Sequence, residues 1–245
     1  MLGQLPFAPF MAAEATSLRW RRRGAALLHR TGTVLHLVGE RVRPAGDPDL
    51  TGDRWVEWSF CMARMSAGPG RTLDFGADVG LLALAAAQRG HEVVALDRLP
   101  PALEYAHPQV RAVQADILDR PLAGETFDQI VNCSSVEHVG LGGRYGSTPA
   151  PDGDLEAMAW MRTLLGPGGR MLLTVPVGRD AVCAPLHRVY GRERLPRLLD
   201  GYRTVEAQHW VKDGARWAQA DGDRALDVPG SERSYALGLF VLTPA

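Results

Sequence analysis

The sequence has little lysine, little cysteine and almost no net charge. Of its 27 basic residues only Lys212 is a lysine, and the formal net charge at pH 7 is −1. Such a chain lacks the positive field that attracts polyanions, so no nucleic acid is expected as a partner. Cys61, Cys133 and Cys183 do not have the spacing of a metal or redox motif. They indicate a reducing compartment and exclude a disulfide framework.

Long apolar runs are also lacking. No segment reaches the roughly 18 uninterrupted apolar residues that a membrane-spanning helix needs, and the first residues lack the basic start of a signal peptide. We therefore expect a cytoplasmic protein without a membrane partner. The length of 245 residues is that of one large α/β domain. We expect an N-terminal helical extension over 1–65 and one compact domain over 66–245.

The most informative stretch runs from Arg71 to Asp97. It reads RTLDFGADVGLLALAAAQRGHEVVALD, which predicts a buried strand, a glycine turn, a helix and a second buried strand that ends on a carboxylate. Gly90 stands where a glycine commonly ends a helix. This is the βαβ unit with which α/β proteins hold adenosine-containing cofactors. The carboxylate of Asp97 can accept hydrogen bonds from both hydroxyls of a ribose.

The glycine spacing in this unit distinguishes two classes of cofactor. Dinucleotide folds use G-x-G-x-x-G, which lets a pyrophosphate approach the helix N-terminus. Here the turn reads GADVG over 76–80, and the carboxylates of Asp74 and Asp78 would repel a diphosphate but suit a cationic sulfonium. The stretch resembles motif I of class I S-adenosylmethionine (SAM) methyltransferases, with Asp78 in place of the middle glycine. The SAM-binding residues that this implies are Asp74, Gly76, Ala77, Gly80, Asp97 and Arg98.

Strands and helices continue to alternate beyond this unit. Further strands are expected near 110–114, 127–133, 169–175, 203–211 and 235–242. Helices are expected near 79–89, 100–106, 153–165 and 192–199. An alternating βα series that closes with a β-hairpin is typical of the seven-stranded methyltransferase sheet. We therefore predict a Rossmann-like α/β fold with a terminal antiparallel hairpin.

Two further strand ends carry polar residues, and ligands of doubly wound sheets bind beyond the carboxyl ends of the strands. Asp116 and Ile117 follow the third strand. An acid at this place resembles the residue that binds the adenine amino group in class I methyltransferases. The fourth strand ends near Asn132, with Ser134 just beyond it. We expect all four residues to contact the cofactor.

A histidine and an acid stand directly after the fourth strand. Methyl transfer from a sulfonium is an in-line displacement, and a hydroxyl acceptor needs a base because it is un-ionised at neutral pH. The stretch SSVEHVG resembles the E-H element of many class I enzymes, where these residues take a proton or contact a divalent ion. We therefore expect Glu137 and His138 to be catalytic. The alternative, in which Glu137 caps a helix and His138 packs, stays open, and no metal ligands are predicted.

Two polar clusters on the ligand side of the sheet are candidates for substrate binding. One belongs to a loop rich in glycine and proline, and the other follows the fifth strand. Loops over a cleft commonly carry binding residues. The candidates are Arg144, Tyr145, His187, Arg188 and Tyr190.

Several motifs together resemble one group of proteins. EHVGLGGRYG, DLEAM, LGPGG, VPVG and HRVYG occur in this order, and the pattern is similar to that of a methyltransferase-like family classed as domain of unknown function 268. The likeness covers roughly residues 54–243. The chain departs from the pattern by an inserted glycine before Arg144 and by Ser147 in place of an aspartate. The resemblance implies a SAM-dependent fold and no particular substrate.

The sequence thus predicts a SAM-dependent methyltransferase. We expect it to act on a hydroxyl or amine of a polar small molecule such as a sugar, a cyclitol or a natural-product scaffold. A non-catalytic SAM-binding protein and an NAD-dependent oxidoreductase are the alternatives. Arg54 and Glu57 either hold the amino-acid end of the cofactor or belong to a helix that packs on the core. The acceptor, the metal dependence and the choice between monomer and homodimer stay open.

Overall fold

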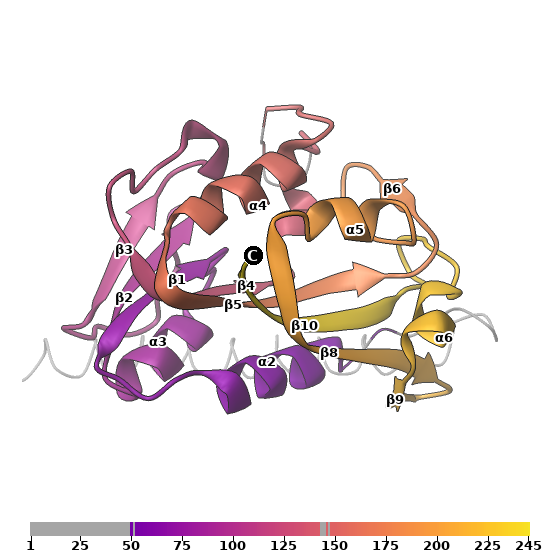
Figure 1. Cartoon of the computed structure of the whole chain (residues 1–245), viewed down its shortest axis with the longest axis horizontal. Coiled ribbons are helices and arrows are strands. Elements are labelled where there is room, and N and C mark those ends of the chain that lie inside the picture. Colours follow the sequence, from indigo (N-terminus) through magenta and orange to yellow (C-terminus); the bar gives the residue numbers. More distant parts are fainter. Residues whose placement is uncertain (1–49, 51, 143–145, 147) are drawn as a thin grey trace, which may run out of the picture. The chain divides into compact units, whose positions relative to one another are not determined.

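The computed structural model describes residues 50, 52–142, 146 and 148–245, all within one compact unit, Pro48–Ala245 (Figure 1). Its centre is an eight-stranded sheet in the order β3-β2-β1-β4-β5-β10-β8-β9. The strands of this sheet are β1 (Gly70–Phe75), β2 (His91–Asp97), β3 (Val110–Gln114), β4 (Phe127–Cys133), β5 (Leu165–Val177), β8 (Tyr202–Asp213), β9 (Arg216–Ala220) and β10 (Ala236–Pro244). A separate two-stranded ribbon consists of β6 (Ala181–Cys183) and β7 (His187–Val189).

Helices cover both faces of the sheet (Figure 1). The α-helices are α2 (Asp53–Arg64), α3 (Leu81–Gln88), α4 (Gly153–Thr163), α5 (Arg194–Leu198) and α6 (Gly222–Leu226). Two single turns of 3₁₀ helix, η1 (Ile117–Asp119) and η2 (Val136–His138), follow β3 and β4. Helices α2 and α3 pack with one apolar cluster, and α4 and α5 pack with a second on the opposite face. None of the described helices is long and apolar enough to cross a membrane.

The strand order confirms the predicted Rossmann-like methyltransferase sheet. Strands β1 to β5 pair in parallel, and β10 runs antiparallel between β5 and β8. The expected terminal hairpin is therefore present as β8 and β10. The sheet has eight strands and not seven, because β9 adds an antiparallel edge strand beside β8. This extra strand lies at the opposite edge from β3 and does not alter the parallel half.

The βαβ unit forms as its residue pattern predicts. Helix α3 consists only of leucine, alanine and one glutamine, which are good helix formers. Ala83, Ala86 and Ala87 are buried, and their small side chains let the helix lie close against β1 and β2. Gly90, with φ +92°, follows the end of the helix in the left-handed conformation that glycine tolerates. The turn before α3 and the carboxyl end of β2 are thereby fixed side by side.

One predicted helix is absent. Residues 100–106 contain no helix, because Pro100 and Pro101 fix the backbone and cannot donate hydrogen bonds. This segment instead packs over the glycine turn. The Ala102 N–H donates to the carbonyl of Asp78 at 2.9 Å, and the Tyr105 hydroxyl donates to the carbonyl of Gly80 at 2.6 Å. The segment thus supports the turn that follows β1.

Helix α2 belongs to the compact unit. The expected extension over 1–65 placed it outside the domain, but Phe60, Cys61 and Met65 are buried in the apolar cluster below α3. Full burial of such a side chain contributes about 1.5–3 kcal/mol. The expected boundary at residue 65 therefore falls inside the unit Pro48–Ala245. Residues 1–49 of the expected extension lie outside the described residues.

Candidate active site

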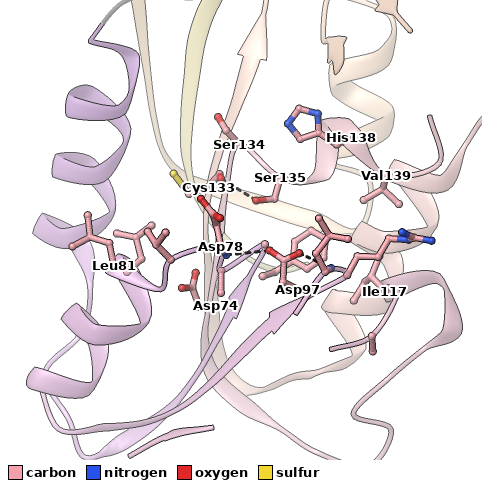
Figure 2. Close-up of a pocket in the computed structure, with 18 of the residues that line it drawn as sticks. Asp74, Asp78, Leu81, Asp97, Ile117, Cys133, Ser134, Ser135, His138 and Val139 are labelled. Carbon is pink, nitrogen blue, oxygen red and sulfur yellow. Dashed lines mark hydrogen bonds between the residues drawn. The ribbon is translucent and has the colours of Figure 1, made fainter. Parts of the chain in front are cut away.

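A cavity of about 320 Å³ opens at the carboxyl ends of β1, β2 and β4 (Figure 2). Ligands of doubly wound sheets bind at this edge, and the volume lies in the range of small-molecule sites. His138 lines it together with much of the expected cofactor site. The expected cofactor residues in its wall are Asp74, Gly76, Ala77, Asp97, Arg98, Asp116, Ile117 and Ser134.

The turn after β1 requires glycine at its first position. Gly76 has φ +74°, and a Cβ atom built there would lie 2.1 Å from the Ser135 hydroxyl oxygen. Any side chain would therefore collide with the loop after β4. The glycine lets the ends of β1 and β4 approach each other, which closes the floor of the cavity.

The position normally held by a second glycine is occupied by Asp78 in a left-handed conformation, with φ +47°. Aspartate tolerates this conformation better than most residues. The Asp78 backbone N–H donates to Oδ2 of Asp97 at 3.0 Å, and the Leu99 N–H donates to Oδ1 at 3.0 Å. Figure 2 shows the first of these bonds across the cavity. Both carboxylate oxygens of Asp97 are thus oriented before a ligand arrives, and each keeps a further lone pair to accept another hydrogen bond.

Asp74 is the buried acid at the base of the cavity. It is 3% exposed, and among the residues that the structure describes none is a hydrogen-bond partner of its Oδ2. Burial raises the pKa of Asp74 to about 7, hydrogen bonding to the Ala83 backbone opposes this rise, and the nearby Asp97 charge adds to it. A buried carboxyl without a partner is costly. A cation or a hydrogen-bond donor placed in the cavity would relieve this cost.

Arg98 and Asp116 form the opposite wall. The Arg98 Nε donates to Oδ2 of Asp116 at 3.1 Å. The other oxygen of Asp116 accepts a hydrogen bond from the Leu118 N–H at 3.0 Å and so caps η1. Ile117 is buried beside them. The carboxylate is held at the end of β3 by two contacts from opposite sides.

Two expected cofactor residues do not line the cavity. Gly80 precedes α3 in a left-handed conformation, and its carbonyl accepts the bond from Tyr105. Asn132 is fully buried. Its side-chain oxygen accepts a hydrogen bond from the Val136 N–H at 3.3 Å, because the chain turns back on itself after β4. These two residues shape the turns beside the cavity, and their role toward the cofactor stays a prediction.

A buried carboxylate links α2 to the strand ends. The Glu57 side chain is fully buried, and its Oε2 pairs with Nη1 of Arg54 at 2.7 Å. Its Oε1 accepts hydrogen bonds from the Thr174 hydroxyl at 2.9 Å and from the Ser134 hydroxyl. Burial raises the pKa of Glu57, and the guanidinium and the hydroxyls oppose that rise. Arg54 lines the cavity, so Glu57 holds a cation at its wall.

Ser134 lies where β4 ends and has φ +45°, which is unusual for serine. Its N–H donates to the Thr174 carbonyl at 3.0 Å, and its hydroxyl is used by Glu57. Strained backbone of this kind is found mostly at functional sites. Ser134 lines the cavity as expected.

His138 stands at the cavity in an orientation that its hydrogen bonds define (Figure 2). Its Nδ1 lies 2.5 Å from the carbonyl oxygen of Leu186. A carbonyl only accepts, so Nδ1 is the donor. The neutral ring then carries its lone pair on Nε2. That nitrogen lies 3.7 Å from Oε1 of Glu137.

Glu137 lies behind His138 and does not line the cavity. Its side chain is 2% exposed, and no hydrogen-bond partner for Oε2 is found in the described part of the chain. Burial raises the pKa of Glu137 to about 8, and the negative charge of Glu57 adds to that rise. The N-cap of η2 is Ser135, and hydrogen bonding of the Glu137 carboxyl group to its own backbone opposes the rise in its pKa. Near neutral pH this carboxyl is largely protonated.

Three of the expected substrate residues are placed by the structure, and two of them are not available to a ligand. Arg188 and Tyr190 are buried and do not line the cavity. Arg188 donates to backbone carbonyls, and the Tyr190 hydroxyl donates to Asp154 at 3.1 Å. The sequence analysis expected these two polar side chains to be exposed to a ligand. Tertiary packing instead encloses them with matching partners.

His187 is half-buried and also lies outside the cavity lining. Its ring meets that of Tyr235 edge-on, with centroids 5.4 Å apart, and burial lowers its pKa. Arg144 and Tyr145 lie outside the described residues. Among the residues that the structure does describe, no group of three His, Cys, Asp or Glu side chains could hold a metal ion.

Several apolar residues of the cavity were not anticipated. Their residue types resemble those of the core, so the sequence carries no signal that separates them from it. Val79, Leu81 and Leu99 are partly exposed at the rim. Leu99 is the exception, because its position two residues after Asp97 places it just beyond the carboxyl end of a strand, where ligands bind. The apolar lining that sequence reasoning missed is Trp58, Phe75, Val79, Leu81, Leu82, Leu99, Pro100, Ala115 and Val139.

Two models of known protein families match this chain. A model described as "Methyltransferase domain" matches residues 72–145. A model described as "Caenorhabditis protein of unknown function, DUF268" matches residues 120–215. The first match extends from β1 to η2, and the second extends from β4 through η2, α4 and the β6–β7 ribbon to the end of β8. The predicted resemblance to both groups is confirmed.

Individual proteins agree with these models. A ubiquinone biosynthesis O-methyltransferase of Xanthomonas campestris pv. campestris (strain B100) is 32% identical over 185 residues, which is 71% of each chain. The 1,6-didemethyltoxoflavin-N1-methyltransferase of Burkholderia thailandensis, solved with S-adenosylhomocysteine, is 18% identical and covers 100% of this chain and 93% of its own, with a TM-score of 0.52. The N-methyltransferase NodS of Bradyrhizobium japonicum WM9 is 20% identical and covers 80% of this chain and 99% of its own, with a TM-score of 0.54. The chain therefore belongs to the class I SAM-dependent methyltransferases, and SAM is its cofactor.

Proposed function

We propose that this methyltransferase transfers the methyl group of SAM to a hydroxyl or amine of a polar small molecule, with His138 as the general base. The observation that carries the proposal is the orientation of His138. Its Nδ1–H is bound to the Leu186 carbonyl at 2.5 Å, which places the basic Nε2 lone pair on the other side of the ring. The same side chain lines the cavity.

The cavity residues fit SAM. Asp97, oriented by two backbone N–H groups, can accept hydrogen bonds from the ribose hydroxyls. One buried oxygen of Asp74 has no hydrogen-bond partner within the described part of the chain, and this carboxyl group would stabilise a cationic amino-acid end. Asp116 and Ile117 lie at the place where the adenine is expected, and Arg54 is a cation for the carboxylate. Bound SAM supplies an electrophilic methyl group on a sulfonium.

The chain supplies a base and the means to hold its proton. An acceptor hydroxyl bound in the cavity beside His138 would lose its proton to Nε2 while its oxygen takes the methyl group and the carbon–sulfur bond of the sulfonium breaks. The imidazolium that results then faces Oε1 of Glu137 at 3.7 Å. Glu137, whose pKa is raised to about 8 by burial, keeps its own proton near neutral pH, and the unprotonated oxygen of its carboxyl group can face the new positive charge as a dipole. Glu137 thus acts by stabilising the protonated His138.

The proposed class of acceptor rests on the polar residues that the sequence places near the site. Arg144, Tyr145 and His187 stay candidates for substrate contacts, whereas Arg188 and Tyr190 are used inside the protein. The relatives include one named as an O-methyltransferase and two named as N-methyltransferases. A hydroxyl oxygen and an amine nitrogen both carry a proton that His138 can remove. Sugars, cyclitols and other polyhydroxylated or aminated natural products are therefore the acceptors to test.

Turnover with methyl-labelled SAM and a panel of such acceptors tests the proposal. His138→Ala should lower turnover by about 10²–10⁴-fold, which is the usual contribution of a positioned base. Calorimetry with S-adenosylhomocysteine should show unchanged cofactor binding. His107→Ala, which changes a histidine outside the cavity lining, is the matched control. Full turnover by His138→Ala would exclude a role for this residue as the base.

A further inference from the structure

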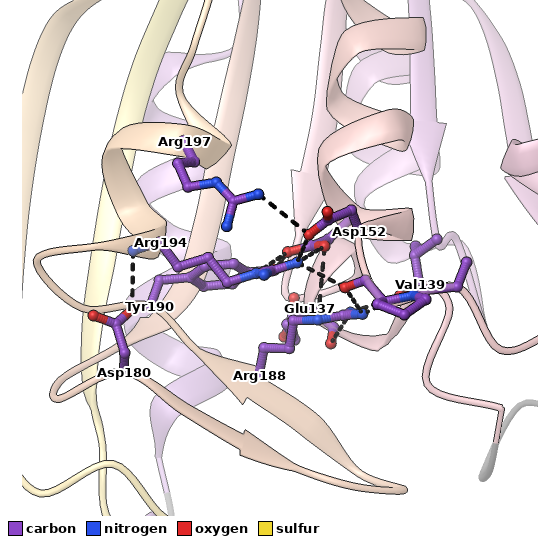
Figure 3. Close-up of polar contacts among 11 residues, drawn as sticks. Glu137, Val139, Asp152, Asp180, Arg188, Tyr190, Arg194 and Arg197 are labelled. Atoms are coloured by element: carbon purple, nitrogen blue, oxygen red, sulfur yellow. Dashed lines mark hydrogen bonds and ion pairs between the residues drawn. The ribbon is translucent and has the colours of Figure 1, made fainter.

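The guanidinium of Arg188 is a buried charged group that the mechanism does not use. It is 1% exposed and comes from β7, on the ribbon that follows the end of β5 (Figure 3). Burial of a charge this complete is costly unless the charge is paired and its donors are used. The contacts of Arg188 therefore show what this position does.

The guanidinium binds the backbone on both sides of His138. Nη1 donates to the carbonyl of Val139 at 2.6 Å and to that of Glu137 at 3.4 Å. These are the residues directly before and after the base. Leu186, two residues before Arg188 on the same ribbon, supplies the carbonyl that holds His138 Nδ1. The ribbon thus holds the side chain and the flanking backbone of His138 at once.

The same guanidinium also binds the backbone just before helix α4. Its Nη2 donates to the carbonyls of Ala150 at 3.3 Å and Pro151 at 3.2 Å. A backbone hydrogen bond joins the same two segments, because the Ala150 N–H donates to the Gly140 carbonyl at 2.8 Å. A fork of several donors in one plane suits this task, whereas the compact ammonium of lysine cannot reach both sides.

An acid and a second arginine fix Arg188 in turn. Its Nε lies 3.6 Å from Oδ1 of Asp154, which is fully buried at the start of α4. Arg194 binds both oxygens of that carboxylate, at 2.5 Å and 2.9 Å, and the Tyr190 hydroxyl adds a contact at 3.1 Å. Figure 3 shows Arg188, Tyr190 and Arg194 meeting between the ribbon and α4. The guanidinium has little freedom to rotate.

We propose that Arg188 is a positioning residue for His138, which holds the base in its Nδ1-protonated tautomer by fixing η2 against the β6–β7 ribbon. The importance of His138 for turnover rests on the proposed function, but its tautomer can be observed without substrate. If Arg188 no longer fixes the carbonyls of Glu137 and Val139, η2 shifts relative to Leu186. The Nδ1–H bond is then lost, and the ring samples both tautomers.

Nitrogen-15 NMR of the histidine rings in the full chain tests this directly. The His138 signals are assigned by their loss in His138→Ala. In the unaltered protein they should show Nδ1 protonated and Nε2 unprotonated. Arg188→Lys, which keeps the charge, should show a mixture of tautomers. Arg192→Gln removes an exposed arginine that pairs with Asp223 and Asp227, and it should leave the His138 signals unchanged. An unchanged tautomer in folded Arg188→Lys would overturn the proposal.

Turnover with an acceptor found in the panel gives an independent reading. A misplaced base costs about 10²-fold in kcat, so Arg188→Lys should lose about this factor while its affinity for S-adenosylhomocysteine stays unchanged. In the His138→Ala background the same change should add less than about twofold, because residues that act through each other are not additive. An equal loss in both backgrounds would show a merely structural role and overturn the proposal.

Two further outcomes keep the proposals separable. If His138→Ala retains full turnover, the proposed function fails, while the NMR result still decides whether Arg188 positions the ring. If Arg188→Lys does not fold, Tyr190→Phe takes its place. This change removes one contact to Asp154 and keeps the ring, so it should shift the tautomer equilibrium in the same direction. No shift in folded Tyr190→Phe would then overturn the positioning role.

Discussion

The backbone N–H of Asp78 donates to Oδ2 of Asp97 at 3.0 Å. It does so from a left-handed conformation with φ +47°, at the position where related motifs carry glycine. The contact joins the turn after β1 to the end of β2 through the main chain of Asp78 and the side chain of Asp97. The departure from the glycine pattern therefore leaves the turn intact, because the bond to Asp97 needs the backbone and not the side chain.

Replacement of Asp78 separates backbone strain from ligand binding. Asp78→Gly should keep the affinity for S-adenosylhomocysteine and raise the free energy of unfolding by up to about 1 kcal/mol, since glycine adopts positive φ without strain. Asp78→Val should lower the free energy of unfolding by about 1–2 kcal/mol, because a β-branched residue resists this conformation. Urea denaturation and calorimetry measure both quantities. A large loss of affinity in Asp78→Gly would show that the carboxylate itself binds the cofactor.

Asp97→Asn tests the ribose contact. The change removes the negative charge and replaces one acceptor with a donor, so the dissociation constant of S-adenosylhomocysteine should rise about tenfold to a hundredfold. Glu92→Gln is the matched control, because Glu92 is an exposed acid on the same strand, and its affinity should be unchanged. Calorimetry at one salt concentration measures all three proteins. An unchanged dissociation constant in Asp97→Asn would falsify the ribose assignment.

Glu137 should make the protein less stable as pH rises. Its pKa is raised from 4.5 to about 8 in the folded state. Between these values the folded state binds the proton that the unfolded state has lost, so the free energy of unfolding falls by up to about 1.4 kcal/mol per pH unit. Glu137→Gln removes this dependence. Its stability relative to the unaltered protein should therefore increase steadily from about pH 5 to pH 8.

Asp74→Asn gives the companion measurement. The pKa of Asp74 is raised from 3.8 to about 7, so the gain in stability on substitution should be complete near pH 7, while that of Glu137→Gln continues to pH 8. Glu156→Gln changes an exposed acid on α4 and should show no such gain. Urea denaturation at a series of pH values measures the differences. Parallel pH profiles for Glu137→Gln and Glu156→Gln would contradict the raised pKa.

The two ion pairs of α2 should differ in strength. Glu57→Gln turns a donor toward Arg54 in a buried site, and we expect it to lower the free energy of unfolding by about 1–3 kcal/mol. Glu206→Gln breaks the more exposed pair with Arg64 and should lower it by less than about 1 kcal/mol. Urea denaturation compares the two. An equal effect of both changes would show that Glu57 does not anchor α2.

Local patterns were sufficient for the elements that hold the cofactor. The leucines and alanines of α3, the glycine after it and the apolar strands on either side predict one βαβ unit, and the structure contains it. The helix expected over 100–106 is absent because two prolines outweigh the other helix formers there. Strand β9 was missed because its short polar sequence resembles a loop. It becomes a strand only because β8 offers an unpaired edge.

The sequence by itself determined the fold class, the cofactor and the acid at each strand end, because these depend on residues close together in the chain. Tertiary structure alone decided which polar residues face the cavity. Arg188 and Asp154 lie far apart in sequence, and only their packing brings the two charges together in the interior. His138 and Leu186 likewise meet through the ribbon after β5. A charge can be buried only where a partner is close to it, and that closeness is a property of the folded chain.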